Sequence, residues 1–341
     1  MLSRYAVAYR DFFDIMGEKI PGRAGRKEYT DMELKYLVIG AGGTGGAIAA
    51  YMKRAGKDVT LIARGEKRQA IREKGLRVRK DGAEWSVSLP AMTEEEYEEL
   101  LSGVAPKPDI IFLCTKYYSV EEVYDVLQRA AGEGTIVIPI QNVYGTGEKI
   151  ARDNPGLHVL NGCMYIAASV EEPGVIRMVS DIFRIFYGEV DGSMGNPLLE
   201  KVRQDLEDAG ITAVYSDNIR RDTLQKFSMV SPNSAVGLYY DCSAQALQRE
   251  GEPRQMYIEC VREIEEIARA MHITFDTDLV ETNLKILDSL DPSFTTSLQK
   301  DVRQGGRTEI DGQIFEVCRL GRKYYIPVPA YDRAAARFGF R

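Results

Sequence analysis

Histidine and cysteine are scarce in this chain of 341 residues, which contains two histidines and five cysteines. Two histidines cannot build a multi-histidine metal site, so no metal is expected and an acid or base of an active site should be Lys, Glu, Asp or Tyr. The cysteine count is odd, and no pair has the Cys-x-x-Cys spacing. This usage argues against a disulfide framework or a zinc site and favours a reducing, cytoplasmic compartment.

Long apolar runs and a strong positive charge are also missing. No stretch reaches the roughly 18 apolar residues of a membrane span, and acidic residues near the start argue against a signal or transit peptide. The net charge of −7 gives no reason to expect nucleic acid or an anionic membrane as a partner. Hydrophobic residues make up 44% of the chain and charged residues 28%, the profile of a globular protein, and the length favours two domains.

The first 33 residues precede any clear strand. Apolar side chains recur there at helical spacing until Pro21-Gly22 interrupts the pattern, at Tyr5, Tyr9, Phe12, Phe13, Met16 and Ile20. We interpret residues 1–33 as an N-terminal extension that is helical and carries no chemistry.

From residue 34 short apolar runs alternate with helical patterns. Strands are predicted at 36–39, 59–62, 76–78, 85–89, 110–113, 135–140, 159–167, 175–178 and 182–186, with a turn at Pro173-Gly174 between the strands at 159–167 and 175–178. Helices are predicted at 47–55, 67–74, 94–101 and 120–130. Such alternation indicates a parallel sheet with helices on both faces.

Strand patterns end near Asp217, and helical patterns follow at 217–238, 253–271, 278–290, 295–303 and 312–320. The sequence therefore predicts an α/β protein. A Rossmann-type doubly wound domain at 34–216 is followed by an all-helical domain at 217–341.

A glycine loop directly follows the first predicted strand and opens a helix. Its residues are Gly40, Ala41, Gly42, Gly43, Thr44 and Gly45, which match Gly-x-Gly-x-x-Gly. In this context Gly40 permits the tight turn, Gly42 lets the backbone approach a pyrophosphate, and Gly45 lets the helix pack on the strand. Because the helix N-terminus presents N–H groups to phosphates, the loop predicts a dinucleotide cofactor.

The end of the second predicted strand indicates which dinucleotide is bound. NAD-preferring sites carry an acid there, whereas this chain has Ala63-Arg64-Gly65. The guanidinium of Arg64 can bind a 2′-phosphate through two hydrogen bonds, so NADPH/NADP is favoured, although Arg64 could also be a solvated surface residue. Lys116 and Asn142 follow two further strands. Lys116 could meet a phosphate or ribose of the cofactor, and Asn142 could reach the nicotinamide ribose or the substrate, although either could lie merely on the surface.

Seven short motifs resemble those of the ketopantoate reductases (2-dehydropantoate 2-reductases), from about residue 34 to the end. They are Gly40–Gly45 with Arg64, Thr115-Lys116, Gln141-Asn142, residues 172–175, residues 218–226 ending in Lys226, Ser297–Asp301 and Arg307–Gly312. The serine twelve residues before the Glu of Thr308-Glu309-Ile310-Asp311 is the most specific of these features.

The resemblance implies NADPH-dependent reduction of a 2-keto acid, most directly ketopantoate to pantoate in pantothenate biosynthesis. It implies that Lys226 is the general acid, that Glu309 binds the substrate hydroxyl, and that Ser297 binds the carboxylate. The residues alone also allow simpler interpretations. Lys226 could be a surface lysine, Glu309 a helix-capping acid, and Ser297 an ordinary serine near a helix N-terminus. The substrate is expected in the cleft between the domains.

Two positions after Lys226 depart from the family, which usually has asparagines there. The chain has Val230 and Ser234 instead, and Asn233 could substitute in part if the helix shifts. Because buried amides discriminate strongly among substrates, another 2-keto acid stays open. A related NADP-dependent hydroxyacid dehydrogenase and a catalytically silent NADP-binding sensor also stay open, as does assembly into a homodimer.

Overall fold

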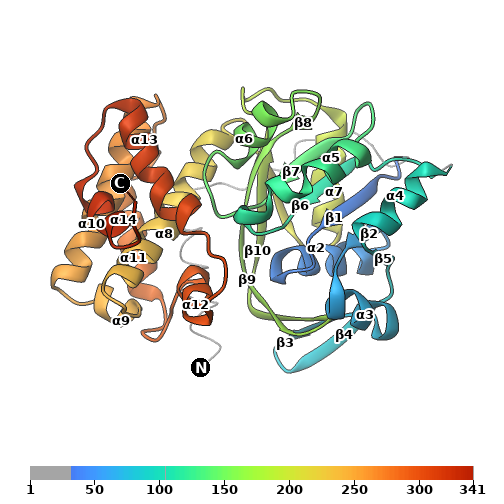
Figure 1. Cartoon of the computed structure of the whole chain (residues 1–341), viewed down its shortest axis with the longest axis horizontal. Helices are drawn as coiled ribbons and strands as arrows, with labels where there is room; N and C mark the ends of the chain where they lie inside the picture. The colour runs from blue at the N-terminus through green and yellow to red at the C-terminus, as the bar shows by residue number, and fades with distance from the viewer. Residues whose placement is uncertain (1–31, 104, 341) are drawn as a thin grey trace. The chain divides into compact units, whose positions relative to one another are not determined.

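The computed structural model describes residues 32–103 and 105–340, and the predicted N-terminal extension falls almost entirely outside them. The chain divides into two compact units, which we describe separately (Figure 1). The sheet unit contains residues 32–141 and Gly145–Ile219. The helical unit contains Asn142–Tyr144 and the chain from Arg220 onward. The α/β fold class predicted from the sequence is confirmed.

The sheet unit is built on six parallel strands in the order β5-β2-β1-β6-β7-β8. Their bounds are β1 Lys35–Ile39, β2 Asp58–Ile62, β5 Ala91–Met92, β6 Ile110–Leu113, β7 Ile136–Pro139 and β8 His158–Val159. The chain runs outward from β1 through β2 to β5, then returns to place β6 on the other side of β1. Such a reversal is a switch point, where ligands bind at the carboxyl ends of the strands.

Alternate residues of these strands pack on opposite faces. In β1, Tyr36 and Val38 join one apolar cluster, while Leu37 and Ile39 join another, and β6 divides in the same way. All four β1 side chains are almost fully buried, so both faces of the sheet are covered. This burial explains why these strands read as continuous apolar runs in the sequence.

A second sheet lies in the same unit, in the order β11-β10-β3-β4 with β9 paired to β10. Its strands are β3 Leu76–Lys80, β4 Ala83–Val87, β9 Asn161–Glu172, β10 Val175–Gly188 and β11 Thr212–Tyr215. The two strands predicted at 175–178 and 182–186 are wrong as separate elements. They form one strand, β10, whose pairing with β9 shifts register between Met178 and Phe183. The bulge absorbs the polar residues that broke the alternation.

Six α-helices pack on these sheets. They are α2 Gly43–Arg54, α3 Gly65–Lys74, α4 Glu94–Ser102, α5 Tyr124–Ala130, α6 Thr146–Asp153 and α7 Pro197–Asp208. The sequence did not predict α6, α7 or β11. The helix predicted at 120–130 is α-helical only in α5, because two 3₁₀ turns precede it at Tyr117–Ser119 and Glu121–Val123.

The longest helix of the helical unit is α8 Ile219–Tyr239, and the other helices are shorter (Figure 1). These are α9 Ala244–Leu247, α10 Glu252–Ala270, α11 Leu279–Ser289, α12 Ser297–Gln304, α13 Glu316–Tyr324 and α14 Pro329–Ala336. The helix predicted at 312–320 begins instead as a π-helical turn at Asp311–Phe315. No helix in the two described ranges combines the length and the apolar character that crossing a bilayer requires.

Pro232 lies inside α8 and has no N–H to give to the carbonyl of Ser228, four residues earlier. The buried side chain of Asn283 on α11 supplies the missing donor, since its Nδ2 lies 3.2 Å from Ser228 O and 3.0 Å from Ser228 Oγ. This bond lets α8 continue through the proline, so Lys226 and Asn233 remain on one helix.

Candidate active site

The glycine loop joins the end of β1 to the start of α2, at the switch point between β1 and β6. Gly40 has φ +112°, which side chains rarely tolerate, and a Cβ there would lie 2.9 Å from Cys114 C. A Cβ on Gly45 would lie 2.9 Å from the Cβ of Cys114 and would also strike Gly40 O. The first glycine therefore makes the turn and the last lets α2 pack against β1 and β6.

Gly42 and Gly43 meet different surroundings. A Cβ on Gly42, the N-cap of α2, would meet nothing within 4 Å, so the space beside this backbone is open. A Cβ on Gly43 would lie 2.7 Å from Ala168 O on β9. Thus Gly43 is required for packing against β9, whereas Gly42 keeps the approach to the helix N-terminus open. Thr44 is half-buried in the first turn of α2.

Two buried polar atoms at the carboxyl ends of β6 and β7 have no hydrogen-bond partner among the described residues. They are Thr115 Oγ1 and Gln141 Oε1. Gln141 is fixed by its amide nitrogen, which donates to Leu113 O at 3.0 Å and to Thr115 O at 3.1 Å. Unsatisfied buried oxygens are costly unless a ligand bonds to them. Together with the open space at Gly42, they fit a dinucleotide along this edge of the sheet.

Arg64 is the N-cap of α3, just beyond β2, as the sequence predicted for a strand-end arginine. Its Nη2 forms an ion pair with Glu94 Oε1, the first residue of α4. The sequence reasoning missed Glu94 because it considered only residues at the end of β2. The local sequence signals only the start of α4, because Thr93 caps this helix in a capping box with Glu96.

Lys116 and Asn142 lie in loops after β6 and β7, and both are half-buried. Lys116 has polar contacts of its own and precedes a 3₁₀ turn. Asn142 follows Gln141 directly but is grouped with the helical unit. The sequence placed both residues in strand-end loops, and that is where they lie.

Lys226 lies in the first half of α8, and only 9% of its surface is exposed. Asn233 lies seven residues further on, within about 20° of the same helix face, and is 8% exposed. Its Nδ2 donates to Met229 O in the preceding turn at 2.9 Å. Val230 is half-buried between these two residues. The face of α8 that carries Lys226 therefore also carries one amide.

Ser234 lies off this face and is fully buried. Its hydroxyl donates to Gln313 Oε1 at 2.9 Å, and Ser231 donates to the carbonyl oxygen of Gln313. Both serines therefore tie α8 to the π-helical turn. Ser234 has a packing partner, which makes it a structural residue at the place where the family usually has asparagine.

Glu309 lies two residues before that turn and is 4% exposed, with polar contacts of its own. Its carbonyl accepts a bond from Gln313 N at 2.8 Å. The π-helical turn is a geometry often found at functional sites. Through Gln313, it fixes the backbone of Glu309 relative to α8.

Ser297 is exposed at the first position of α12. Thr296 caps this helix, since its Oγ1 accepts from Gln299 N at 3.2 Å while the Gln299 side chain accepts from Thr296 N at 3.0 Å. Gln299 also packs against Gly237 of α8, where a Cβ would lie 2.7 Å from its amide. Ser297 therefore does not cap α12, and this helix packs against α8 through Gln299.

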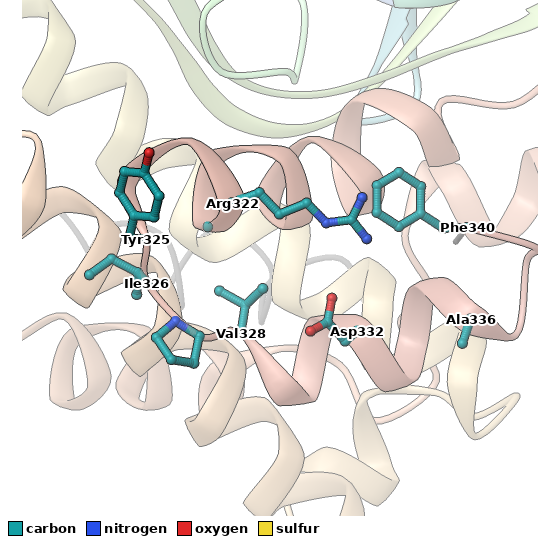
Figure 2. A pocket seen from close by; sticks show the side chains of 9 residues that line it. Arg322, Tyr325, Ile326, Val328, Asp332, Ala336 and Phe340 are labelled. Atoms are coloured by element: carbon teal, nitrogen blue, oxygen red, sulfur yellow. The ribbon is translucent and has the colours of Figure 1, made fainter.

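A cavity of about 640 Å³ opens elsewhere in the helical unit, between α13 and α14 (Figure 2). Figure 2 shows Arg322 extending from α13 toward the ring of Phe340, with its guanidinium carbon 4.7 Å from the ring centre. None of the side chains that the sequence predicted for the site lines this cavity. The residues of the candidate site are thus distinct from this cavity.

The six-stranded parallel sheet, its switch point and the glycine loop define a Rossmann-type dinucleotide-binding fold. Comparison with known families identifies the particular family. The sequence model described as "Ketopantoate reductase PanE/ApbA" matches residues 36–192, and "Ketopantoate reductase PanE/ApbA C terminal" matches residues 218–338. The chain belongs to the ketopantoate reductase family, whose named members are oxidoreductases that act on a keto group.

Individual relatives are distant. A 2-dehydropantoate 2-reductase of Pyrococcus horikoshii is 28% identical, with 84% of this chain and 91% of the relative covered. A ternary structure of D-mandelate dehydrogenase with NADH and anilino(oxo)acetate has a TM-score of 0.75 at 23% identity, covering 88% of this chain and 96% of that one. A dimeric ketopantoate reductase from Staphylococcus aureus has a TM-score of 0.74 at 19% identity, covering 89% and 96%. The two structures support the fold, and the family supports a nicotinamide cofactor.

Proposed function

We propose that this protein reduces a 2-keto acid with NADPH, and that ketopantoate, reduced to pantoate for pantothenate biosynthesis, is the first substrate to test. The observation that carries the proposal is the burial of Lys226 on α8, at the position where the family resemblance puts the general acid. Lysines are rarely buried to this extent unless they are paired, and Lys226 has interactions of its own.

The residues that would hold the cofactor are those described above. Gly40, Gly42 and the N-terminus of α2 would receive the pyrophosphate, and Arg64 would receive the 2′-phosphate. Lys116 and Asn142 would contact the nicotinamide half or its ribose. When bound, NADPH supplies the hydride that reduces the carbonyl carbon.

Lys226 would act on the carbonyl oxygen of the substrate. As the carbonyl carbon is reduced, negative charge develops on this oxygen, and an ammonium beside it stabilises that charge and donates the proton. The products are a 2-hydroxy acid and a neutral lysine, which regains its proton from solvent. A metal is not required for this step, because the ammonium polarises the carbonyl.

Three further side chains would orient the substrate. Glu309 would accept a hydrogen bond from the substrate hydroxyl, Ser297 would donate to the carboxylate, and Asn233 would offer its amide from the Lys226 face of α8. Because the Nδ2 of Asn233 already donates to Met229 O, its amide oxygen suits acceptance of a hydrogen bond from a substrate hydroxyl.

A different 2-keto acid, or the corresponding hydroxyacid in the oxidative direction, is the second candidate. It is favoured by Val230, which offers no hydrogen bond, and by Ser234, whose hydroxyl is engaged with Gln313. The D-mandelate dehydrogenase that shares this fold acts on an aromatic hydroxyacid, as its name states. An apolar residue at 230 suits a less polar side chain on the substrate.

The test is the decay of NADPH absorbance with ketopantoate, beside pyruvate, 2-oxobutyrate and benzoylformate. Turnover fastest with ketopantoate supports the first candidate, and turnover fastest with another keto acid supports the second. Tight NADPH binding without turnover of any 2-keto acid would contradict both candidates and leave the silent NADP-binding sensor.

We also propose a homodimer, as in the Staphylococcus aureus relative, which light scattering of the purified protein would test.

A further inference from the structure

Arg64 and Glu94 occupy equivalent places on two neighbouring parallel strands. In the pairing of β2 with β5, Ile62 lies opposite Met92. Each strand ends there, and Arg64 and Glu94 both follow two residues later. Ala63 N donates to Met92 O at 2.9 Å, which holds the two chain ends side by side. The ion pair between them therefore follows from the register of the sheet and is not a chance surface contact.

The two partners differ in exposure. The side chain of Arg64 is 62% exposed, while that of Glu94 is 16% exposed. The carboxylate is thus held by the first turn of α4, and the guanidinium reaches out from it toward solvent. The next arginines of α3, Arg68 and Arg72, are both paired with Glu96. Arg64 is the arginine nearest the strand end, and Glu94 is its partner.

An acid beside the end of the second strand is the feature by which NAD-preferring sites bind the ribose 2′-hydroxyl. Here the acid arrives from β5 instead of β2. A carboxylate at this place repels the 2′-phosphate of NADPH and occupies part of the guanidinium that would bind it, but it leaves the hydroxyl of NADH unopposed.

We propose that Glu94 is a specificity-determining residue of the cofactor site, whose carboxylate competes with the 2′-phosphate for Arg64 and so lowers the preference for NADPH over NADH. The inference rests on the proposed function, because it assumes that Arg64 is the 2′-phosphate ligand. It goes beyond that function because it gives Glu94 an effect opposite to that of Arg64. The preference between NADPH and NADH is then set by two residues that follow adjacent strands.

The experiment measures dissociation constants of the full-length protein for NADPH, NADH, 2′,5′-ADP and 5′-AMP by fluorescence or calorimetry. Glu94→Gln keeps the size of the side chain and removes its charge. Glu98→Gln is the matched control, because Glu98 lies on the same helix and pairs with Arg129 at 2.8 Å. Arg64→Ala tests the underlying assignment. Thermal unfolding of each variant checks that it is folded.

We expect Glu94→Gln to tighten NADPH and 2′,5′-ADP by about two- to fivefold, the range that exposed ion pairs span. NADH and 5′-AMP should change little, and Glu98→Gln should leave all four constants unchanged. Arg64→Ala should weaken 2′,5′-ADP by about tenfold or more. If Glu94→Gln leaves the preference for NADPH over NADH unchanged or lowers that preference while Arg64→Ala has its effect, the role of Glu94 is wrong. If Arg64→Ala has no effect, the assignment of NADPH to Arg64 fails instead.

Discussion

Ser234 of α8 donates a hydrogen bond to Gln313 Oε1 of the π-helical turn, 2.9 Å away, and both residues are fully buried. The bond joins the helix that carries Lys226 to the turn that follows Glu309. Ser234 also stands where the family usually has an asparagine. The hydroxyl at this position is therefore used to join two segments of the helical unit.

Ser234→Ala should destabilise the protein, because it leaves the buried amide oxygen of Gln313 without a donor. The expected loss is about 1–3 kcal/mol in the free energy of unfolding, measured by urea denaturation. Ser289→Ala is the control, since Ser289 is half-buried and its hydroxyl donates to Ile286 O within its own helix. A loss no larger than that of the control would show that the Ser234–Gln313 bond contributes nothing.

Gly42→Ala and Gly45→Ala should separate cofactor binding from folding. The added methyl on Gly42 meets no protein atom within 4 Å, so the variant should unfold at the wild-type temperature. The same methyl should weaken NADPH binding by about tenfold or more, because it fills the space where backbone approaches phosphate.

Gly45→Ala has the opposite pattern, since its methyl would strike Gly40 O and lie 2.9 Å from Cys114 Cβ. Overpacking of this kind costs about 1–3 kcal/mol or more, and calorimetry should show a lower unfolding temperature. If Gly42→Ala binds NADPH like the wild type, the open space at Gly42 is not the cofactor's path.

Much of the fold could be predicted from the sequence, because it depends on local patterns. A few consecutive residues are enough to recognise the apolar runs of β1 and β6, the glycine loop and the long helix around Lys226. The missed features depend on partners far along the chain. Glu94 meets Arg64 only through the pairing of β5 with β2, and the bulge in β10 is defined by β9.

The same limit applies to the candidate site. Sequence identified Lys226, Glu309 and Ser297 through a family pattern, but it could not show that Thr296 caps α12 and leaves Ser297 exposed. Nor could it show that Gln313 engages the hydroxyl of Ser234. Hydrogen bonds between segments 79 residues apart have no signature in local spacing.

Glu263 gives the helical unit a pH-dependent stability. Burial raises the pKa of its carboxyl to about 7, although Oε1 and Oε2 accept bonds from Ala330 N at 2.7 Å and Tyr331 N at 3.1 Å, at the start of α14. The folded state holds this proton more tightly than the unfolded chain does. The contribution of protonated Glu263 to the free energy of unfolding is therefore fully present below about pH 4.5 and is lost as pH rises through about 7.

The measurement is the free energy of unfolding between pH 4.5 and 8 for the wild type and Glu263→Gln. The wild type should lose more stability than the variant over this interval, since glutamine cannot titrate. Parallel curves for the two proteins would mean that Glu263 has an ordinary pKa. Glu259→Gln serves as control, because Glu259 pairs with Arg333 at 2.8 Å on the surface of the same helix, α10.

The most direct test of the account is the turnover number of Lys226→Ala with NADPH and the best 2-keto acid of the panel, beside Lys285→Ala. Lys285 is a half-exposed lysine of the same unit, paired with Glu281 at 2.6 Å. If Lys226 protonates the carbonyl oxygen, its loss should lower kcat by about 10²–10⁴-fold, leave NADPH affinity unchanged, and spare the Lys285 variant. A Lys226→Ala protein that turns over at the wild-type rate would contradict the proposed mechanism.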